Sequence, residues 1–484
     1  MSDISLFIIT NIFPLLMLAV IFGVSLLWLF HAGKSHYLIY FFLAWLPLET
    51  LFLKYSPSEY YNFIKYGPEL LLYAALAVAY ARFIWRERRW WPADPISKWL
   101  AVFLVVSVLS LLLNRYDVYV WALGLRQLLR FMSVYFLIIM ENYSAEQKHK
   151  LLLFGLGMVI FESILAVAQY ATRGALDQYL FFGNEISVGN ATIIGIEQFW
   201  APGTRAFATL GRYDRLAGWL ALSVAILFPW RYVIKDKSKI IKFWIVFGLV
   251  MLALLLSYSR AGMLAAGVGI CAVGLWIMKD EALKRFLAIL AVAGLLYLGL
   301  FAILQGSISD IVDRPAQPLS ERLLEAVSPR SWKASYNGYG RIFFIVNVPT
   351  MVVTRFPLFG VGLGRFGDGV ASALGDQSVY TMLHLPFGVQ NTYGQIDNNW
   401  FSIWAGVGTV GVICWAMILI LLLRFGYRVS GNAVSVETRS LGRGLVGATV
   451  AVMVLGFFAP YFEFRVLMFY FWAYAGLVVS SDNK

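Results

Sequence analysis

One arginine interrupts a long apolar part of the sequence. Arg260, in the string SYSRAG at 257–262, is the only charged residue between Phe243 and Met278. A guanidinium stays protonated at any ordinary pH, and at membrane depth it costs about 2.5–3.5 kcal/mol on insertion scales. Such a residue usually faces a polar cavity. We therefore expect Arg260 to bind an anion at or near a membrane surface.

More basic residues lie in two long segments between the apolar runs, 172–215 and 305–399. Because the guanidinium fork pairs bidentately with phosphate oxygens, they predict a pocket for phosphate or diphosphate. The alternative is that they pair with lipid headgroups or with acidic residues of the same segments, namely Asp310, Asp313, Glu321 and Glu325. The basic residues of these segments include Arg205, Arg212, Arg215, Arg314, Arg322, Arg330, Lys333, Arg341, Arg355 and Arg365.

The composition is that of a membrane protein. Hydrophobic residues make up 60% of the 484 residues, charged residues only 14%, and the mean hydropathy is +0.72. A soluble domain has about 25% charged residues. The net charge of +12 would suggest nucleic acid in a soluble protein. Here basic loops on the inner side of a membrane account for such a surplus, and we expect no nucleic-acid partner.

Apolar runs of bilayer length predict an all-α polytopic protein with about 12–14 transmembrane helices. The N-terminal run has no basic region or cleavage site typical of a signal peptide, so we interpret it as a first span. The thirteen predicted spans are 5–30, 37–53, 68–85, 97–113, 121–140, 150–171, 216–231, 241–258, 261–278, 285–304, 400–423, 444–459 and 464–481.

Four basic clusters orient these spans, because positive loops favour the cytoplasmic side. They follow the third, seventh, ninth and eleventh spans, so all four fall on one side, with the N-terminus outside and the C-terminus inside. This predicts N-terminal transmembrane helices (1–171), an outer-face loop (172–215), central helices with the SRAG string (216–304), a large, partly helical periplasmic loop (305–399) and C-terminal helices (400–484). The clusters are Arg82–Lys98, Arg231–Lys242, Lys279–Arg285 and Arg424–Arg443.

The sequence gives no sign of a metal site or a cofactor. Cys271 and Cys414 lie in apolar runs without metal-ligand spacing, and the four histidines are scattered. The glycines at 360, 362, 364 and 367 follow a proline, but no strand precedes them as a nucleotide-binding loop would require. They indicate a tight turn or close packing instead.

Several strings resemble the signatures of the O-antigen ligase and polymerase superfamily, in the family's order over roughly residues 200–425. SYSRAG resembles its "SRG" motif. YGR at 339–341, followed by RFPLFGVGLG at 355–364, resembles "R…W…hPllGvGlG". DNNWF at 397–401 with GVGTVG at 406–411 resembles "HN/DN…eGliG", and 204–222 resembles an upstream element.

This resemblance implies a GT-C-type membrane glycosyltransferase in the bacterial inner membrane, with its active site facing the periplasm. The donor would be an oligosaccharide on undecaprenyl diphosphate, bound by arginines without a metal. By position, the diphosphate-binding arginines would be Arg260 and Arg341, with Arg205 or Arg215 as a third. Polymerases pass the glycan to another lipid-linked unit, whereas ligases pass it to lipid A-core. Membrane lipids and a chain-length regulator are further expected partners.

The sequence departs from the ligases at one position. They carry His before the Asn of the "HN" motif, whereas this chain has Asp397, as members of the polymerase branch do. An aspartate can act as general base for a sugar hydroxyl, so Asp397 joins Arg260 and Arg341 as a catalytic candidate. The alternative is that Asp397 caps the following helix. Secondary candidates are His384, Asn398 and Tyr339.

Three other interpretations stay open at this point. A ligase would use the same donor with a different acceptor. A lipid-linked oligosaccharide flippase or transporter would favour inverted repeats and charges along a midplane path, whereas no repeat is visible and most polar residues cluster on one face. A membrane scaffold without catalysis would neither bind nor turn over the donor.

Overall fold

The computed structural model describes residues 34–184, 186–188, 191–193, 195, 197, 200–304, 311, 317–389, 395–433 and 435–482. The predicted first span, 5–30, lies outside them. The described chain is predominantly helical, and its only strands are β1 (Ile186–Val188) and β2 (Ala191–Ile193), a short antiparallel pair. With its candidate membrane spans, this confirms the all-α polytopic membrane fold.

The longer helices are α3 (His36–Tyr55), α4 (Tyr61–Glu87), α5 (Pro95–Asn114), α6 (Val118–Leu129), α7 (Met132–Glu141), α8 (Ala145–Ala171), α10 (Tyr213–Leu227), α11 (Lys237–Leu256), α12 (Arg260–Cys271), α13 (Glu281–Leu304), α20 (Asn399–Asn432), α21 (Val436–Leu455) and α22 (Arg465–Asp482). The shorter elements are α9 (Asp177–Leu180), α14 (Leu319–Leu324), α15 (Pro329–Asn337), α16 (Arg341–Val348), α17 (Gly369–Leu374) and α18 (Ser378–Met382), the 3₁₀ turns η2 (Ser58–Tyr60), η4 (Phe228–Tyr232), η7 (Glu325–Val327) and η9 (Tyr461–Glu463), and the π turns η5 (Ala272–Ile277) and η8 (Pro349–Val353).

Capping residues fix where several of these helices begin. The carboxylate of Asp94 accepts from the backbone N–H of Ser97 at 3.0 Å, one residue before α5. Ser144 and Gln147 form a capping box at the start of α8. Such caps satisfy backbone donors that have no partner inside the helix, so the polar residues between the apolar runs set the helix boundaries.

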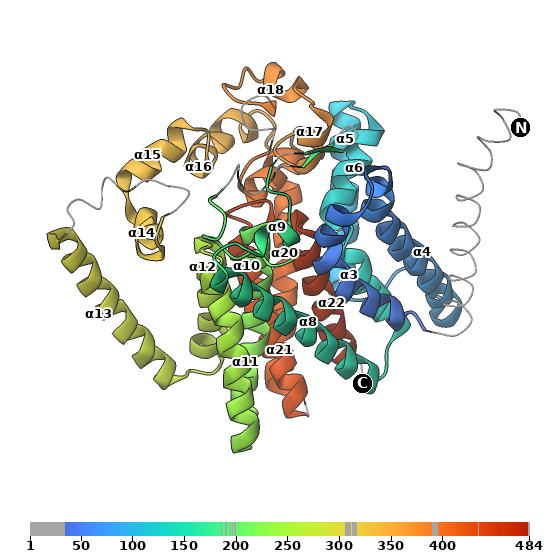
Figure 1. Cartoon of the computed structure of the whole chain (residues 1–484). Coiled ribbons are helices and arrows are strands. Elements are labelled where there is room, and N and C mark those ends of the chain that lie inside the picture. Colours follow the sequence, from blue (N-terminus) through green and yellow to red (C-terminus); the bar gives the residue numbers. More distant parts are fainter. Residues whose placement is uncertain are drawn as a thin grey trace, which may run out of the picture.

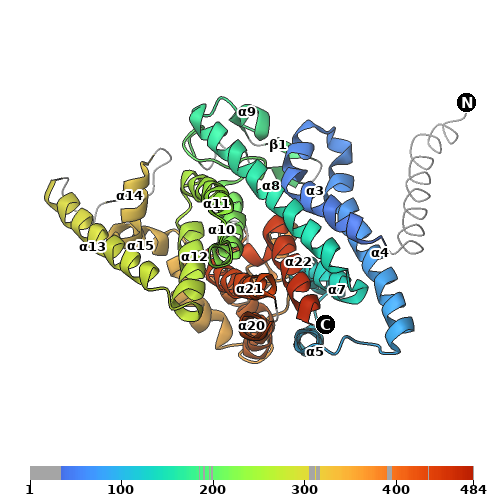
Figure 2. The same cartoon turned by 90° about the horizontal axis from the view of Figure 1, so that it is seen from below.

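The centre of the bundle contains α10, α12, α20, α21 and α22 (Figures 1 and 2). α21 packs against α10, α12 and α20, and small residues allow the close approach. A Cβ added to Gly269 would lie 2.9 Å from the carbonyl oxygen of Gly447, and one on Gly426 would lie 2.8 Å from that of Gly442. Small residues at helix contacts are typical of membrane bundles.

Eight described helices are long and apolar enough to cross a membrane, or nine if the bent pair α6 and α7 counts as one span. The expectation of about 12–14 spans is therefore not met within the described residues. The pair α6–α7 bends by 63° where 121–140 was predicted to be one continuous span. The predicted spans 216–231, 444–459 and 464–481 correspond to α10, α21 and α22, which fall outside this set. These three helices lie in the centre of the bundle with most of their residues buried. α10 has only 15 residues, and Arg465–Ser481 in α22 is also among the shorter apolar helices.

The four basic clusters gather at one end of the bundle, as predicted. Arg231 forms an ion pair with Asp280 at 3.1 Å, which joins the second cluster to the third. Tyr232 donates to Asp280 at 2.7 Å and lies in the electrostatic field of Arg443, in the fourth cluster. The loop after α4 and the end of α20 line one hollow, which joins the first cluster to the fourth. We call this part of the molecule the basic end.

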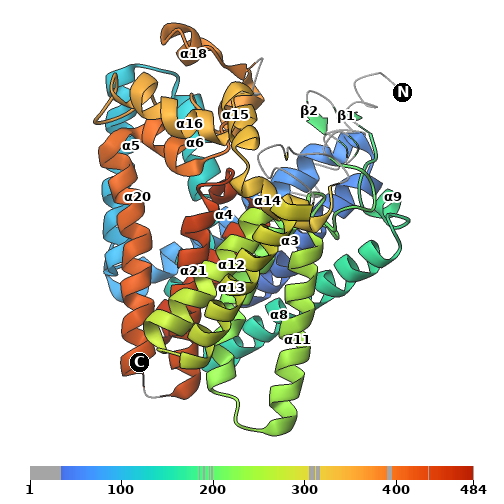
Figure 3. The same ribbon diagram turned by 90° about the vertical axis from the view of Figure 1, so that its left-hand side faces the viewer.

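The segment 305–399 is partly helical, as expected. Its helices α15, α16, α17 and α18 gather at the end opposite the basic end (Figures 1 and 3). α16 and η8 together form the apolar helix Arg341–Val353. α13, which leads into this segment, lies at the edge of the molecule and is almost wholly exposed (Figure 2).

Backbone hydrogen bonds join the glycine-rich string 355–364 to the start of α20. The N–H groups of Val361 and Gly362 donate to the carbonyl oxygens of Ala405 and Gly406, each at 2.8 Å, and that of Thr409 donates to Pro357 at 2.8 Å. Gly360 has φ +66° and an added Cβ would overlap the Ala405 carbonyl. Both observations require glycine. The tight-turn interpretation is confirmed, and two separate sequence motifs prove to be one structural unit.

Candidate functional site

The predicted key residue lies where the sequence indicated, in a tight turn. α11 ends at Leu256, Tyr258 has φ +57°, and α12 begins at Arg260. Ser259 caps α12 by accepting from the N–H of Gly262 at 3.4 Å. Gly262 has no room for a side chain, because a Cβ would lie 2.7 Å from that of Ala217. Close packing of α12 on α10 therefore fixes the turn that holds Arg260.

Arg260 is paired with a buried carboxylate. Its guanidinium lies 3.0 Å from Glu325, whose side chain is 3% exposed, while that of Arg260 is 26% exposed. Glu325 also pairs with Arg322 at 2.9 Å and accepts from the hydroxyl of Ser331 at 3.2 Å. Two arginines thus share one carboxylate, which holds both guanidinium groups in place.

Arg341 is the first residue of α16 and is held more loosely. Its Nε lies 3.7 Å from Asp397, which is too long for a hydrogen bond. This buried Nε has no hydrogen-bond partner among the described residues, and the two side chains are 39% and 57% exposed. A half-exposed pair of this kind contributes about 0–1 kcal/mol, so an anion can replace Asp397 as the partner of Arg341 at small cost.

The segment 204–215, which leads into α10, carries three arginines, of which Arg205 and Arg215 were the predicted diphosphate-binding candidates. Arg212 forms a bidentate pair with Asp214, at 3.0 Å for each contact, and lies in the electrostatic field of Asp397. Arg205 is buried, with its guanidinium 4.5 Å from the centre of the Tyr213 ring. Arg215 lies over Phe464, 5.8 Å from its centre. Arg212 is therefore the basic residue of this segment that faces Asp397.

These groups form one cluster, which we call the arginine site. Arg260 lies in the field of Arg322 and Arg341. The hydroxyl of Tyr461 is hydrogen-bonded to Ser259 and lies in the field of Asp214 and Arg341, and burial raises the pKa of this tyrosine, so it stays a hydrogen-bond donor. The cluster holds more positive than negative charge. Its members are the arginines Arg212, Arg260, Arg322 and Arg341, the carboxylates Asp214, Glu325 and Asp397, and the hydroxyl of Tyr461.

The string DNN divides its roles among three residues. Asn398 is the N-cap of α20, since its side-chain oxygen accepts from the N–H of Phe401 at 3.1 Å. The alternative that Asp397 provides this cap is therefore wrong, and its exposed carboxylate faces Arg341. Asn399 is buried and bonds the N–H of Phe462 at 2.7 Å and the carboxylate of Glu463 at 3.3 Å.

Glu463 and Asp368 are buried beside this motif and bear on its protonation. Glu463 accepts from Gln127 at 2.9 Å and from the N–H of Gly369 at 3.2 Å. Burial, reinforced by the neighbouring Asp368, raises the pKa of Glu463 to about 7. Burial likewise raises the pKa of Asp368 to about 6. The side chain of Asn399 in the DNN string therefore contacts a carboxyl group, that of Glu463, whose pKa lies near neutral pH.

Two secondary candidates lie outside the cluster. Tyr339 packs its ring against Phe343 and Phe387, with centroids 5.0 and 6.2 Å apart. His384 is exposed in the turn after α18, and its backbone N–H donates to Thr381 at 3.0 Å. No contact described here joins either side chain to the arginine site.

Sequence reasoning missed several members of the site. Arg322 and Glu325 are a basic and an acidic residue three positions apart in the sequence. Only the structure shows that they pair with each other and that Glu325 also pairs with Arg260. Arg212 was counted among the outer arginines without being selected, and Asp214 sits in the same short string. Tyr461 carried no signal, because it comes from a turn between two apolar runs.

One comparison with known proteins bears on this site. Residues 243–416 match a family model described as O-antigen ligase, and the match includes Arg260, Arg322, Glu325, Arg341 and Asp397. No curated protein matches the chain. The matched segment runs from α11 to α20, so over about a third of its length the chain is similar to this family; the candidate membrane spans agree with a multi-pass membrane protein.

Proposed function

We propose that this protein polymerises lipid-linked oligosaccharide repeat units. A glycan would pass from undecaprenyl diphosphate to a sugar hydroxyl of a second lipid-linked unit. The observation that carries this proposal is the arginine site, in which four arginines gather with three carboxylates and the exposed carboxylate of Asp397 lies 3.7 Å from Arg341. Similarity to the family supports transferase activity on lipid-linked glycans, and the site suggests which groups perform it.

Arg260 and Arg341 bind the diphosphate of the donor in this proposal. Arg341 offers a buried Nε without a hydrogen-bond partner, and Arg260 shares its carboxylate with Arg322. Guanidinium groups held in place before the reaction stabilise the charge that develops on the departing diphosphate. Within the described ranges, no three His, Cys, Asp or Glu side chains are grouped to hold a metal ion. In this proposal the guanidinium groups supply the positive charge that faces the diphosphate.

Asp397 is the proposed general base. The acceptor hydroxyl gives its proton to this carboxylate while its oxygen forms a bond to the anomeric carbon. The bond from that carbon to the phosphate oxygen breaks, and its electron pair leaves with the diphosphate. Diphosphate binding draws Arg341 toward the phosphates, which frees the carboxylate 3.7 Å away. The same movement would couple donor binding to activation of the base.

The basic end suggests how the protein sits in the membrane. Under the positive-inside rule, the end with four basic clusters faces the cytoplasm. The arginine site would then face the periplasm of a bacterial inner membrane, where a chain-length regulator is an expected partner. Accessibility of cysteines introduced beside Arg330 and beside Lys237, probed with an impermeant thiol reagent on intact cells, tests this orientation.

A ligase is the second candidate, because the matched family model carries that description. The two functions differ in the acceptor. Purified protein given only the undecaprenyl-diphosphate oligosaccharide should form a ladder of longer glycans if it is a polymerase. A product that appears only when lipid A-core is added would overturn the polymerase assignment in favour of a ligase. Asp397→Asn should abolish whichever product forms.

A further inference from the structure

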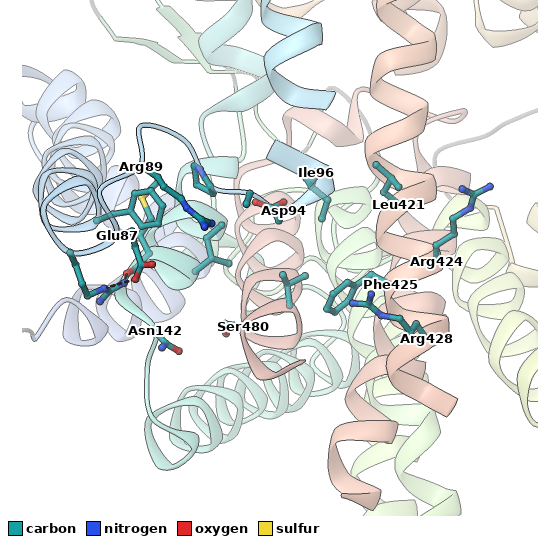
Figure 4. Close-up of a pocket in the computed structure, with 17 residues that line it drawn as sticks. Glu87, Arg89, Asp94, Ile96, Asn142, Leu421, Arg424, Phe425, Arg428 and Ser480 are labelled. Carbon is teal, nitrogen blue, oxygen red and sulfur yellow. Dashed lines mark hydrogen bonds and ion pairs between the residues drawn. The ribbon is translucent and has the colours of Figure 1, made fainter. Parts of the chain in front are cut away.

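A hollow of about 710 Å³ lies at the basic end, away from the arginine site. It is bounded by the end of α4, the start of α5, the end of α7 and the C-terminal parts of α20 and α22. Figure 4 shows Arg89 entering it from the side of α4 and Arg428 with Phe425 facing it from α20. The proposed glycan transfer makes no use of this region.

The hollow carries a surplus of positive charge. Four arginines line it, against two carboxylates, Glu87 and Asp94. Both carboxylates already have partners: Glu87 accepts from Arg86 at 3.0 Å, and Asp94 accepts from Ser97 and from Tyr135 at 3.1 Å. Arg89, in contrast, has neither an acidic partner nor a hydrogen bond among the described residues. The charge here is suited to an anion.

One wall of the same hollow is apolar. Ile139, Leu421, Phe425 and Val479 contribute to it, and the guanidinium of Arg428 lies 4.8 Å from the centre of the Phe425 ring. A free inorganic anion would gain nothing from such a wall. A ligand with an anionic head and a hydrocarbon chain would contact both parts, because apolar burial adds to the electrostatic attraction.

Exposed tryptophans mark the depth of this hollow. Trp85 and Trp90 are 72% and 76% exposed, on either side of the arginines at the end of α4. The hydroxyl of Tyr80 donates to the carbonyl oxygen of Trp90 at 2.6 Å, which holds this loop against the helix. Tryptophan is enriched at the level of lipid headgroups, so the hollow opens where phospholipid headgroups lie.

We propose that this hollow binds one anionic phospholipid. Its phosphate lies between Arg89 and Arg428, and an acyl chain lies along the wall formed by Leu421 and Phe425. Basic pockets between transmembrane helices bind anionic headgroups by the same combination of charge and apolar contact. The bound lipid would link the loop after α4 to the end of α20, two parts of the chain that are far apart in sequence.

The test uses the full-length protein in detergent and compares phosphatidylglycerol with phosphatidylcholine of the same acyl chains. Native mass spectrometry measures the dissociation constants. The wild type should bind the anionic lipid about tenfold more tightly. The double variant Arg89→Gln/Arg428→Gln should lose most of this preference. Lys237→Gln/Lys239→Gln is the matched control, because it removes two exposed charges from the same end and should keep the preference.

Three results would overturn this assignment. The first is equal binding of both lipids by the wild type, a result that does not depend on whether the variants fold. The double variant could keep the full preference while its tryptophan fluorescence and elution volume match those of the wild type. Glycerol 3-phosphate could displace the lipid at an equal concentration, which would make the hollow a site for a free phosphate ester. We expect the double variant to keep its glycan transfer activity, because the hollow and the arginine site are separate.

Discussion

Replacing Arg260 by alanine separates its role in binding from any role in folding. The substitution removes one guanidinium from Glu325, but Glu325 keeps Arg322 at 2.9 Å and the hydroxyl of Ser331 at 3.2 Å. Leaving a buried charge without a partner costs about 3–5 kcal/mol. Because this carboxylate stays paired, we expect a much smaller loss of stability.

The loss of activity should be large by comparison. Removing one preorganised donor from the place where negative charge develops lowers rates by about 10²–10³-fold, or about 3–4 kcal/mol. Arg260→Ala should therefore reduce glycan transfer by at least about a hundredfold. Arg260→Lys keeps the charge but loses the bidentate fork, and its activity should fall between those of the wild type and the alanine variant.

The assay follows formation of the glycan ladder by purified protein from lipid-linked repeat units. Each variant is compared with the wild type for its amount in the membrane, its elution volume and its unfolding temperature. Arg285→Ala is the control, because Arg285 is exposed near the start of α13. Near-normal turnover by Arg260→Ala would refute the proposed role. A fall in unfolding temperature large enough to account for the lost activity would show that Arg260 acts through the fold.

Three further predictions concern groups around the site. Asp397→Asn should lower turnover while leaving donor affinity, measured by isothermal titration, within about threefold; a large loss of affinity with unchanged turnover would contradict the role of base. The pKa of Glu463 is raised from 4.5 to about 7, so its stabilising contribution is complete below pH 4.5 and is lost as pH rises through 7. The unfolding temperature should fall between pH 5 and 8 in the wild type and fall less in Glu463→Gln, and parallel curves would contradict this. Gly360→Ala should lower stability by about 1–3 kcal/mol, whereas Gly157→Ala, which has open space, should not; equal unfolding temperatures would rule out the proposed strain.

The turn at Arg260 shows what local sequence can predict. An arginine between two apolar runs must leave the bilayer core, and a Ser before it supplies a helix cap. Both consequences appear in the structure as the turn after α11 and the Ser259 cap of α12. The grouping of basic clusters at one end was also predictable, since it depends only on the order of apolar runs.

The number of spans and the full membership of the site were not predictable in the same way. Hydropathy does not show where an apolar run breaks: the predicted span 121–140 is two helices bent by 63°, and α10 ends at Leu227, after which the 3₁₀ turn η4 begins. The arginine site draws on segments more than two hundred residues apart, from Arg212 to Tyr461. The packing of α12, α14 and α16 decides which carboxylate pairs with which arginine. This pairing cannot be predicted from the spacing of residues in the sequence.

The backbone pairing between 357–362 and 405–409 has a consequence for engineering. A segment 305–399 exchanged between relatives would normally be cut before the helix that begins at Asn399. That cut would separate the two hydrogen-bonded strings, so that 357–362 would come from one relative and 405–409 from another. A working chimaera should instead carry the segment together with α20 as far as Gly411. The unit to be exchanged therefore includes the first part of this helix as well as the segment before it.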